Sequence, residues 1–381
     1  MMRPMKLAGS ELMFGQGCLE HLKALKGNRA IIIMSGDVLE KTGILNKVKA
    51  YLNEAKVETE VFSDVEPEPS FATVLKGTEK MKSFSPDWII ALGGGSPMDA
   101  AKAKWIYYEL PELTKLSDIE APNEFPKLRN KARLVCIPST SGTASEVSRS
   151  IVITDEKTGT KHGIGNMEMM PDIAICDPEV TASMPPKITA ETGLDALTHA
   201  VEAYVSNRAN YISDILAVQA VKDIFEYLPK AFDEGTNMEY REKMLNASLI
   251  AGLAFTNVSL GIVHSMAHTV GGYFKIPHGL ADAVILPYVI KFNSANKNAN
   301  QRYSQLAKLV GADNFSQAVA NLKARLNIPK GFNALIDDEE KYNSMIDEMA
   351  QVAAKDGCTK TNPLIPSHED FVELFKEVYI G

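Results

Sequence analysis

Short apolar runs alternate with amphipathic stretches through the first half of the chain. A β-branched run at residues 29–37 ends in a turn, and similar runs lie at 57–62, 88–92, 133–138 and 172–178. Such alternation is typical of a parallel sheet covered by helices. We therefore predict an α/β fold for this half.

The second half carries a different pattern. Beyond Met184-Pro185-Pro186-Lys187, the apolar positions recur with a helical period almost to the C-terminus. The paired prolines mark a break in regular structure. In a chain of 381 residues we expect an α/β domain over residues 1–184 and an all-α domain over residues 185–381.

An aspartate and a histidine share one face of a predicted helix. The segment 193–204 has apolar residues at helical spacing, and Asp195 and His199 lie one turn apart in it. A single pair of this kind is also common as a surface or capping pair. Glu202, one turn further, is a candidate to orient an imidazole, or a member of a helix salt bridge.

Three more histidines follow in the same half. His264 and His268 are again four residues apart, in an apolar segment (260–272) whose terminal glycines predict a helix stop. His278 lies in a Pro-His-Gly turn ahead of an apolar helix expected over 280–286. The turn would direct His278 back at the helix of Asp195.

One carboxylate and three imidazoles are suitable donors for Fe(II), Zn(II), Co(II) or Mn(II). No cysteine lies near them, which argues against a structural zinc site. A three- or four-ligand site with an open position acts as a Lewis acid. We therefore predict a catalytic metal held by Asp195, His199, His264 and His278.

A glycine-rich turn follows the third expected strand. The run 88–92 leads directly into Gly93-Gly94-Gly95-Ser96 and an expected helix. Glycines let the backbone approach a ligand, and the N–H groups of a helix start bind phosphate oxygens. A pyrophosphate-bearing cofactor fits this turn, although glycine clusters also form plain strand-to-helix connections.

Two other positions fit a nucleotide. Asp37, after the first run, is a candidate acceptor for a ribose hydroxyl and would repel a 2'-phosphate, which favours NAD over NADP; a turn or capping aspartate is the alternative. The hydroxyl-rich loop 139–146 can surround a nucleotide, or it can be an ordinary loop with a helix cap.

Composition excludes some partners. The net charge of -8 offers no attraction to nucleic acid or to an anionic membrane, and no uncharged apolar run approaches the length of a membrane span. Four scattered cysteines without framework spacing are expected in a reducing compartment. We expect a cytoplasmic protein.

Taken together, the motifs resemble the iron-containing (group III) alcohol dehydrogenases. Five segments carry the resemblance: Phe14–Gly17, Gly93–Lys102, Pro138–Glu146, Gly193–Glu202 and Gly261–Gly279. It implies an N-terminal Rossmann-like domain and an all-α C-terminal domain, an architecture shared with dehydroquinate synthase. It also implies NAD, usually Fe(II) and sometimes Zn(II), and a homo-oligomer, most simply a dimer.

The resemblance also implies roles for individual residues. By matching position, the metal ligands are the four donors named above. The cofactor-binding residues are Asp37, Gly94, Gly95, Ser96, Asp99, Ser139, Thr140 and Thr143. His268 matches a histidine near the nicotinamide and is a candidate proton relay or a supporting residue. The chain departs from the family at Glu68, where many relatives have asparagine, and at Leu364, where many have arginine.

The expected reaction is hydride transfer between NAD(H) and a short primary alcohol, a diol or the matching aldehyde, with the metal as Lewis acid. Segments 189–205 and 248–274 carry no lysine or arginine, which disfavours phosphorylated substrates. Residues 254–257 are candidates to line the pocket. The alternatives are a lyase like dehydroquinate synthase and a non-catalytic NAD-binding assembly protein.

Overall fold

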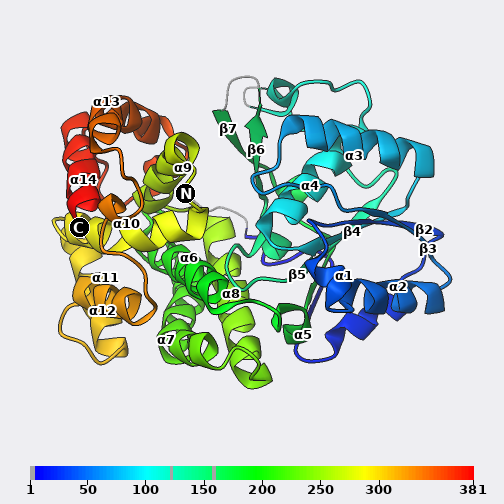
Figure 1. Ribbon diagram of the computed structural model, residues 1–381, viewed down its shortest axis with the longest axis horizontal. Helices are drawn as coiled ribbons and strands as arrows, with labels where there is room; N and C mark the ends of the chain where they lie inside the picture. Colours follow the sequence, from blue (N-terminus) through cyan, green and yellow to red (C-terminus); the bar gives the residue numbers. More distant parts are fainter. Residues whose placement is uncertain (1–4, 121–122, 157–159) are drawn as a thin grey trace. The chain divides into compact units, whose positions relative to one another are not determined.

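The computed structural model describes residues 5–120, 123–156 and 160–381 (Figure 1). The chain divides into two compact units, Met1–Met184 and Pro185–Gly381.

The first unit contains a six-stranded parallel sheet. The strand order is β1-β8-β5-β4-β2-β3, and every neighbouring pair is parallel. The strands are β1 (Glu11–Phe14), β2 (Arg29–Ile33), β3 (Glu58–Phe62), β4 (Trp88–Gly93), β5 (Arg133–Pro138) and β8 (Ile173–Cys176). Because β2, β4 and β5 are neighbours, the loops that follow them lie side by side at one edge.

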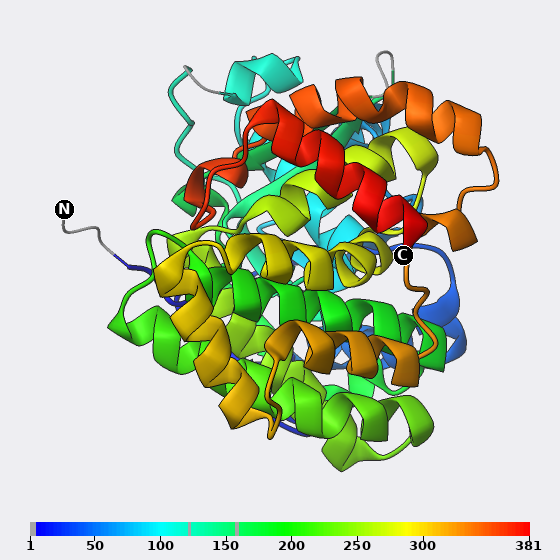
Figure 2. The same ribbon diagram turned by 90° about the vertical axis from the view of Figure 1, so that its left-hand side faces the viewer.

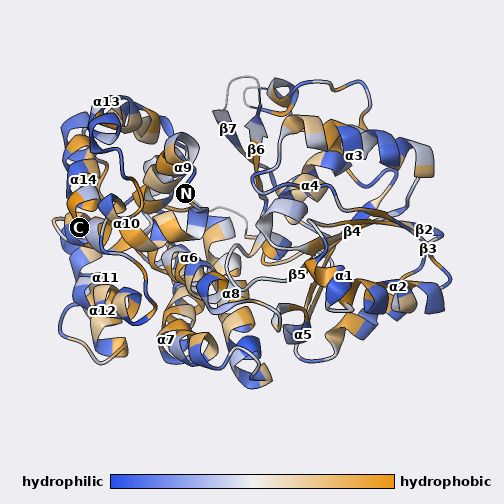
Figure 3. Ribbon diagram, viewed as in Figure 1, coloured by the Kyte–Doolittle hydropathy of each residue, from blue (hydrophilic) through white to orange (hydrophobic). Residues whose placement is uncertain are grey.

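Alternate residues of each strand enter two separate cores. On β2, Ile31 and Ile33 pack with helices α3 and α4, whereas Ala30 and Ile32 pack with η1, α1, α2 and α5. Strands buried on both faces read as continuous apolar runs, and Figure 3 shows the central strands in the hydrophobic colour. The helices are η1 (Cys18–Ala24), α1 (Val38–Lys41), α2 (Ile44–Glu54), α3 (Phe71–Phe84), α4 (Gly95–Glu109) and α5 (Pro178–Thr181).

Strand β1 and a separate hairpin of this unit were not among the predicted elements. Strand β1 has no inward apolar run, since both of its end residues are exposed. The hairpin joins β6 (Ser150–Asp155) and β7 (Thr160–Gly165) in antiparallel register. It has a buried side that packs on α4.

The second unit is helical in all of its described regular structure (Figure 2). Helix α6 is central and packs against α7, α8 and α10. The helices are α6 (Pro186–Val205), α7 (Tyr211–Asp233), α8 (Met238–Val258), α9 (Ile262–Phe274), α10 (His278–Asn293), α11 (Lys297–Leu309), α12 (Phe315–Arg325), α13 (Glu339–Lys355) and α14 (His368–Ile380). A parallel sheet with helices followed by a helical second half confirms the predicted fold class.

Two helix boundaries differ from the prediction. Helix α9 continues through the glycines that were expected to stop it and ends at Phe274; the capping residue Lys275 has a φ of 57° and donates its N–H to Gly271 O at 3.1 Å. Gly271 is buried, and tertiary packing outweighs its low helix propensity.

Helix α10 begins at His278 rather than at residue 280, and it continues through Pro287 to Asn293. Proline disturbs the helix bonding of the preceding turn. There the buried Lys323 ammonium donates to Val284 O at 3.0 Å, which satisfies one carbonyl of that turn.

Among the described residues, no single helix has the length and apolar character to span a bilayer. Within the described part of the chain, only the pair α8 and α9 is long and apolar enough when the two helices are taken together, and this pair is bent by 101° at its break.

Candidate functional site

Two carboxylates and two imidazoles converge in the core of the helical unit. Asp195 on α6, His264 on α9, and His278 and Asp282, one turn apart at the start of α10, each bring one donor atom within 4.8 Å of the others. Asp195, His264 and Asp282 are buried, and the His278 side chain is 38% exposed. Such a set can hold one divalent ion that remains accessible from one side.

Close approach of two helices brings these residues together. A Cβ at Gly279 would lie 2.6 Å from Glu191 O and 3.3 Å from the Cβ of Asp195. Only glycine therefore lets the start of α10 lie against α6 at the level of Asp195. His278 and Asp282, on either side of this glycine, are thereby fixed beside the Asp195 carboxylate.

His199 borders this cluster but lies outside its tightest group. Its Nε2 is 3.4 Å from Asp195 Oδ1, and its ring stacks on His264 with a centroid distance of 4.8 Å. On its other side the ring stacks on Phe255 at 4.4 Å. The four predicted donors are thus gathered in one place, and His199 is held by ring stacking as well as by its helix.

Glu202 orients the His264 ring. Its Oε2 lies 2.6 Å from His264 Nδ1, and its Oε1 accepts the Val263 N–H at 2.7 Å. A proton on Nδ1 that points at a carboxylate leaves the Nε2 lone pair of His264 available to a metal. Burial raises the pKa of Glu202 to about 7, against the opposing effect of the backbone hydrogen bonds. Glu202 thus contacts the His264 imidazole, and no helix salt bridge of Glu202 occurs among the described residues.

Four buried polar atoms at this site have ion-pair contacts with each other's residues but make no hydrogen bond among the described residues. Asp195 Oδ1, His264 Nε2 and both Asp282 oxygens have no hydrogen-bond partner within the described part of the chain. Burial raises the pKa of Asp195, and burial and the Asp195 charge raise that of Asp282 well above its usual range. Buried unpaired donors are costly, and a divalent cation would satisfy all four atoms at once. The residues therefore fit a metal ion.

His268 forms a pair with a carboxylate that was not predicted from the sequence. Its Nδ1 lies 2.9 Å from Asp356 Oδ2, and its ring stacks on His278 at 5.3 Å. Asp356 Oδ1 also accepts the Cys358 N–H at 2.7 Å. Burial would raise the pKa of Asp356, but the His268 and Cys358 hydrogen bonds hold it well below its usual range. The His268 ring is thus fixed next to a predicted metal ligand.

In the α/β unit, the glycine turn and the hydroxyl-rich loop face each other. A Cβ on Gly94 would contact Thr140 Cγ2 at 3.4 Å, and one on Gly95 would lie 3.0 Å from Thr143 Cγ2. No side chain caps the start of α4 at Gly94, and uncapped N–H groups at a helix start are suitable donors to an anion. The Ser139 N–H donates to Gly93 O at 2.9 Å, which ties the loop to the turn. The backbone and hydroxyl groups fit a pyrophosphate.

Asp99 and Ser96 make contacts inside the unit. Asp99 accepts hydrogen bonds from Ser145 Oγ at 2.7 Å and from Val152 N at 2.9 Å, so both of its oxygens order the neighbouring loop and strand β6. Ser96 Oγ accepts the N–H of Glu68, one of the departures from the family pattern, at 3.2 Å. Glu68 has a φ of 56° and pairs with Lys161.

Asp37 follows β2 at the same edge of the sheet as the glycine turn. It occupies the N-cap position of α1 without a side-chain cap, and its exposed carboxylate lies 2.7 Å from Lys41 Nζ. A hydrogen bond from Lys41 lowers the pKa of Asp37.

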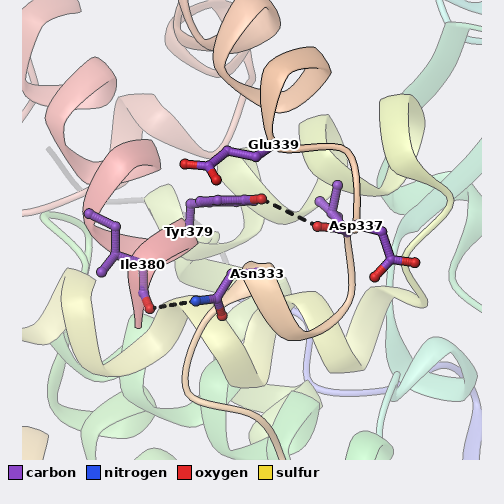
Figure 4. A pocket seen from close by; sticks show the side chains of 6 residues that line it. Asn333, Asp337, Glu339, Tyr379 and Ile380 are labelled. Carbon is purple, nitrogen blue, oxygen red and sulfur yellow. Dashed lines mark hydrogen bonds between the residues drawn. The ribbon is translucent and has the colours of Figure 1, made fainter.

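A pocket of the helical unit lies away from these residues (Figure 4). It measures ≈ 450 Å³ and lies between the start of α13 and the end of α14. Asn333 donates to Ile380 O at 2.9 Å, and the Tyr379 hydroxyl donates to Ile336 O at 3.3 Å. None of the predicted site residues lines this pocket. Of the side chains that commonly bind metals, its described lining contains only the carboxylates of Asp337 and Glu339.

Comparison with known proteins gives matches along both units. The family model "Iron-containing alcohol dehydrogenase" matches residues 9–178, and "Fe-containing alcohol dehydrogenase family, C-terminal" matches residues 189–379. An NADPH-dependent butanol dehydrogenase from Clostridium saccharobutylicum is 45% identical, with 97% of each chain covered.

Two further relatives differ in length and organism. Aldehyde-alcohol dehydrogenase 2 from Entamoeba histolytica is 41% identical over 97% of this chain, which spans 46% of that protein. The structure of an iron-containing alcohol dehydrogenase from Thermococcus thioreducens superposes with a TM-score of 0.92 at 34% identity, over 99% of this chain and 100% of that one. The predicted resemblance is confirmed: the chain belongs to the iron-containing alcohol dehydrogenase family.

Proposed function

We propose that this protein, an oxidoreductase of the alcohol dehydrogenase family, is a metal-dependent, NAD(H)-linked dehydrogenase of short primary alcohols and diols that also reduces their aldehydes. The observation that carries the proposal is the convergence of Asp195, His199, His264 and His278 around buried atoms that make no hydrogen bond among the described residues. These four residues would hold the metal, Fe(II) or alternatively Zn(II).

The metal would polarise the oxygen of the alcohol or aldehyde, and the nicotinamide would exchange a hydride with the carbon that bears this oxygen. Oxidation of the alcohol then releases one proton. His268, held at Nδ1 by Asp356, presents its other ring nitrogen for this proton and is partly exposed, so it is the proposed relay to solvent. Glu202 keeps the His264 ring in the orientation that ligation needs.

The substrate is proposed from what surrounds the donors. Phe255 stacks on His199 and supplies an apolar wall. The segments 189–205 and 248–274 contain no lysine or arginine, so they offer no countercharge to a phosphate. Small neutral alcohols and aldehydes suit this surrounding best. The names of the butanol dehydrogenase relative and of a 1-propanol dehydrogenase from Citrobacter freundii support the same class.

The test is anaerobic oxidation of NADH with straight-chain aldehydes from acetaldehyde to hexanal. Protein freed of metal would be reconstituted separately with Fe(II) and Zn(II). We expect turnover only with metal, and none in a His264→Ala variant that circular dichroism shows to be folded. Tight binding of metal and NADH without turnover of any aldehyde would contradict the proposal.

The dinucleotide is proposed to lie on Gly94, Gly95 and Ser96, with Ser139, Thr140 and Thr143 around it and Asp99 ordering the loop. Asp37 would bond the ribose and disfavour a 2'-phosphate. Since the butanol dehydrogenase relative is named as NADPH-dependent, the preference needs its own test. We expect a higher kcat/KM with NADH than with NADPH, and a gain for NADPH of about tenfold in Asp37→Gly. An unchanged ratio would remove Asp37 from this role.

We also propose a homo-oligomer, most simply a dimer. Light scattering coupled to size-exclusion chromatography measures its mass, and a monomer at micromolar concentration would contradict it.

A further inference from the structure

A second carboxylate lies inside the proposed metal centre. Asp282, on the first turns of α10, is 0% exposed. Neither of its oxygens has a hydrogen-bond partner among the described residues. A buried, unpartnered carboxylate is costly, and native proteins rarely keep one without a compensating charge. A cation held between Asp282 and its neighbours Asp195 and His278 would supply that compensating charge.

The distances show where that partner would sit. Asp282 Oδ2 is 3.2 Å from His278 Nε2 and 3.7 Å from His264 Nε2. Two atoms that bind one ion at about 2.1 Å lie roughly 3 to 3.5 Å apart. The Asp282 contacts thus match the spacing of ligands around one ion as closely as those of Asp195 Oδ1, which lies 3.8 Å from His264 Nε2 and 4.0 Å from His278 Nε2.

The orientation of the His264 and His278 rings also places Asp282 on the side where a metal would bind. His264 Nδ1 is taken by Glu202, so its Nε2 is the nitrogen left for a metal. Asp282 approaches that same nitrogen, and it approaches Nε2 of His278 as well. An outer residue that only orients an imidazole contacts the nitrogen turned away from the metal, as Glu202 does. Asp282 lies on the opposite, metal-facing side.

We propose that Asp282 is an additional ligand of the metal ion, so that two carboxylates and three imidazoles surround it. This inference rests on the proposed function and deepens it. Two carboxylates neutralise a divalent ion in a buried site, and five protein donors favour a coordination number above four. Iron and manganese accept that number with oxygen donors, whereas zinc in proteins prefers four ligands. The chain is thereby biased towards Fe(II) or Mn(II).

The experiment compares the wild type with Asp282→Asn and with a control, Glu191→Gln. Glu191 is a buried carboxylate one turn before Asp195, its Oε1 lies 4.0 Å from Lys187 Nζ, and it is not among the converging donors of the cluster. Metal-free protein is titrated with Fe(II), Mn(II) and Zn(II) against a competing chelator. The visible spectrum of the Co(II) form reports coordination number, because four-coordinate Co(II) absorbs strongly and five- or six-coordinate Co(II) weakly.

We expect Asp282→Asn to bind Fe(II) and Mn(II) about 10- to 100-fold more weakly, to lose less affinity for Zn(II), and to gain Co(II) absorption. Glu191→Gln should match the wild type in both measurements. Unchanged affinities and an unchanged spectrum in Asp282→Asn would overturn the inference. If that variant does not fold, the Co(II) spectrum of the wild type tests the inference by itself. An intense spectrum, typical of four-coordinate Co(II), would overturn the inference.

The two failures are distinguishable. If the wild-type protein binds no divalent ion, both the proposed function and the role of Asp282 are contradicted. If the wild type binds metal and reduces aldehydes, and the Asp282→Asn variant binds metal equally well, only the role of Asp282 is contradicted.

Discussion

At the scale of single residues, Glu202 performs two tasks that a neutral amide cannot combine. Its two oxygens accept from Val263 N and face His264 Nδ1. A glutamine has one oxygen, so its NH₂ group would face either the backbone N–H or Nδ1. If it faces Nδ1, the ring proton moves to Nε2, where the metal would bind.

We therefore predict that Glu202→Gln weakens metal binding about tenfold or more. Chelator competition measures this, with Glu191→Gln as the matched buried carboxylate. Equal metal affinity in Glu202→Gln and the wild type would show that the tautomer of His264 is set by something else.

Two buried lysines on α4 have opposite surroundings. Lys102 Nζ donates to Ser145 Oγ at 2.9 Å and to the Ser148 and Ser150 carbonyls at 3.0 and 3.2 Å. Lys104 Nζ has no hydrogen-bond partner within the described residues and lies 4.7 Å from the Phe62 ring centre. Burial lowers the pKa of Lys104 from 10.5 to about 7, against a small opposing effect of Glu66.

We predict that Lys104→Met stabilises the protein at pH 6 and that Lys102→Met destabilises it. The unfolded chain holds the Lys104 proton up to pH 10.5 and the folded chain only up to about 7, so this lysine destabilises fully below pH 7 and less as pH rises. The gain from Lys104→Met should be on the order of a few kcal/mol at pH 6 and shrink towards pH 10. Urea denaturation at both pH values measures it, and a gain that does not change with pH would contradict the account.

The donors were predictable from the sequence where helical spacing exposed them. Asp195 and His199 lie four residues apart, and so do His264 and His268. Asp282 has the same spacing from His278, but the sequence predicts a helix that begins only at residue 280, which hides the pair. Asp356 is distant in sequence from His268, and no local pattern links the two. The roles of the predicted ligands stay predictions until metal binding is measured.

At the scale of elements, the start of α4 depends on the absence of a side chain at Gly95. A Cβ there would lie 3.0 Å from Thr143, so the hydroxyl-rich loop would have to shift away from the glycine turn. We predict that Gly95→Ala weakens NADH binding about tenfold or more, since the backbone N–H groups and the loop no longer converge. Quenching of intrinsic fluorescence by NADH measures the affinity.

Gly272 on α9 provides the control. Nothing lies within 4 Å of a Cβ placed there among the described residues, so Gly272→Ala should leave NADH affinity unchanged and stabilise the helix by about 0.5–1 kcal/mol. If Gly95→Ala binds NADH as tightly as Gly272→Ala does, the glycine turn does not hold the cofactor.

The sequence predicts best those elements that are buried along their whole length and on both faces. Strands β2, β4 and β5 are covered on both faces and appear as plain apolar runs. Strand β1 and the β6–β7 hairpin have partly exposed residues and contain glycine or charged residues, so their pairing depends on tertiary contacts. The start of α10 depends on packing against α6, and α9 packs against α10 and α13, which local glycine and proline signals do not reveal.

At the scale of the whole molecule, the motifs of both halves identify the family, and the family fixes the fold. The substrate, the dinucleotide preference and the metal are set by a few contacts and are not visible at that scale. Asp37 and Asp282 are single residues whose exchange would leave the fold and the family assignment unchanged.

Metal binding should stabilise the helical unit, because the ion satisfies buried atoms only in the folded state. A ligand at 100 times its Kd adds about 2.7 kcal/mol, which for a unit of this size raises Tm by roughly 5 to 10 °C. We predict a fall of this size when Fe(II) is removed by chelation. Differential scanning calorimetry measures it, and the His264→Ala variant should show no such fall. An equal chelator effect in both proteins would indicate that the metal binds elsewhere.

The most direct test of the central claim is an anaerobic titration of metal-free protein with Fe(II), in which butanal-dependent NADH oxidation is recorded at each addition. The account predicts a rate that rises in proportion to added Fe(II), reaches a plateau at one ion per chain, and is absent when His264 or His278 is replaced by alanine. Undiminished turnover in the metal-free protein, or a rate indifferent to these substitutions, would contradict it.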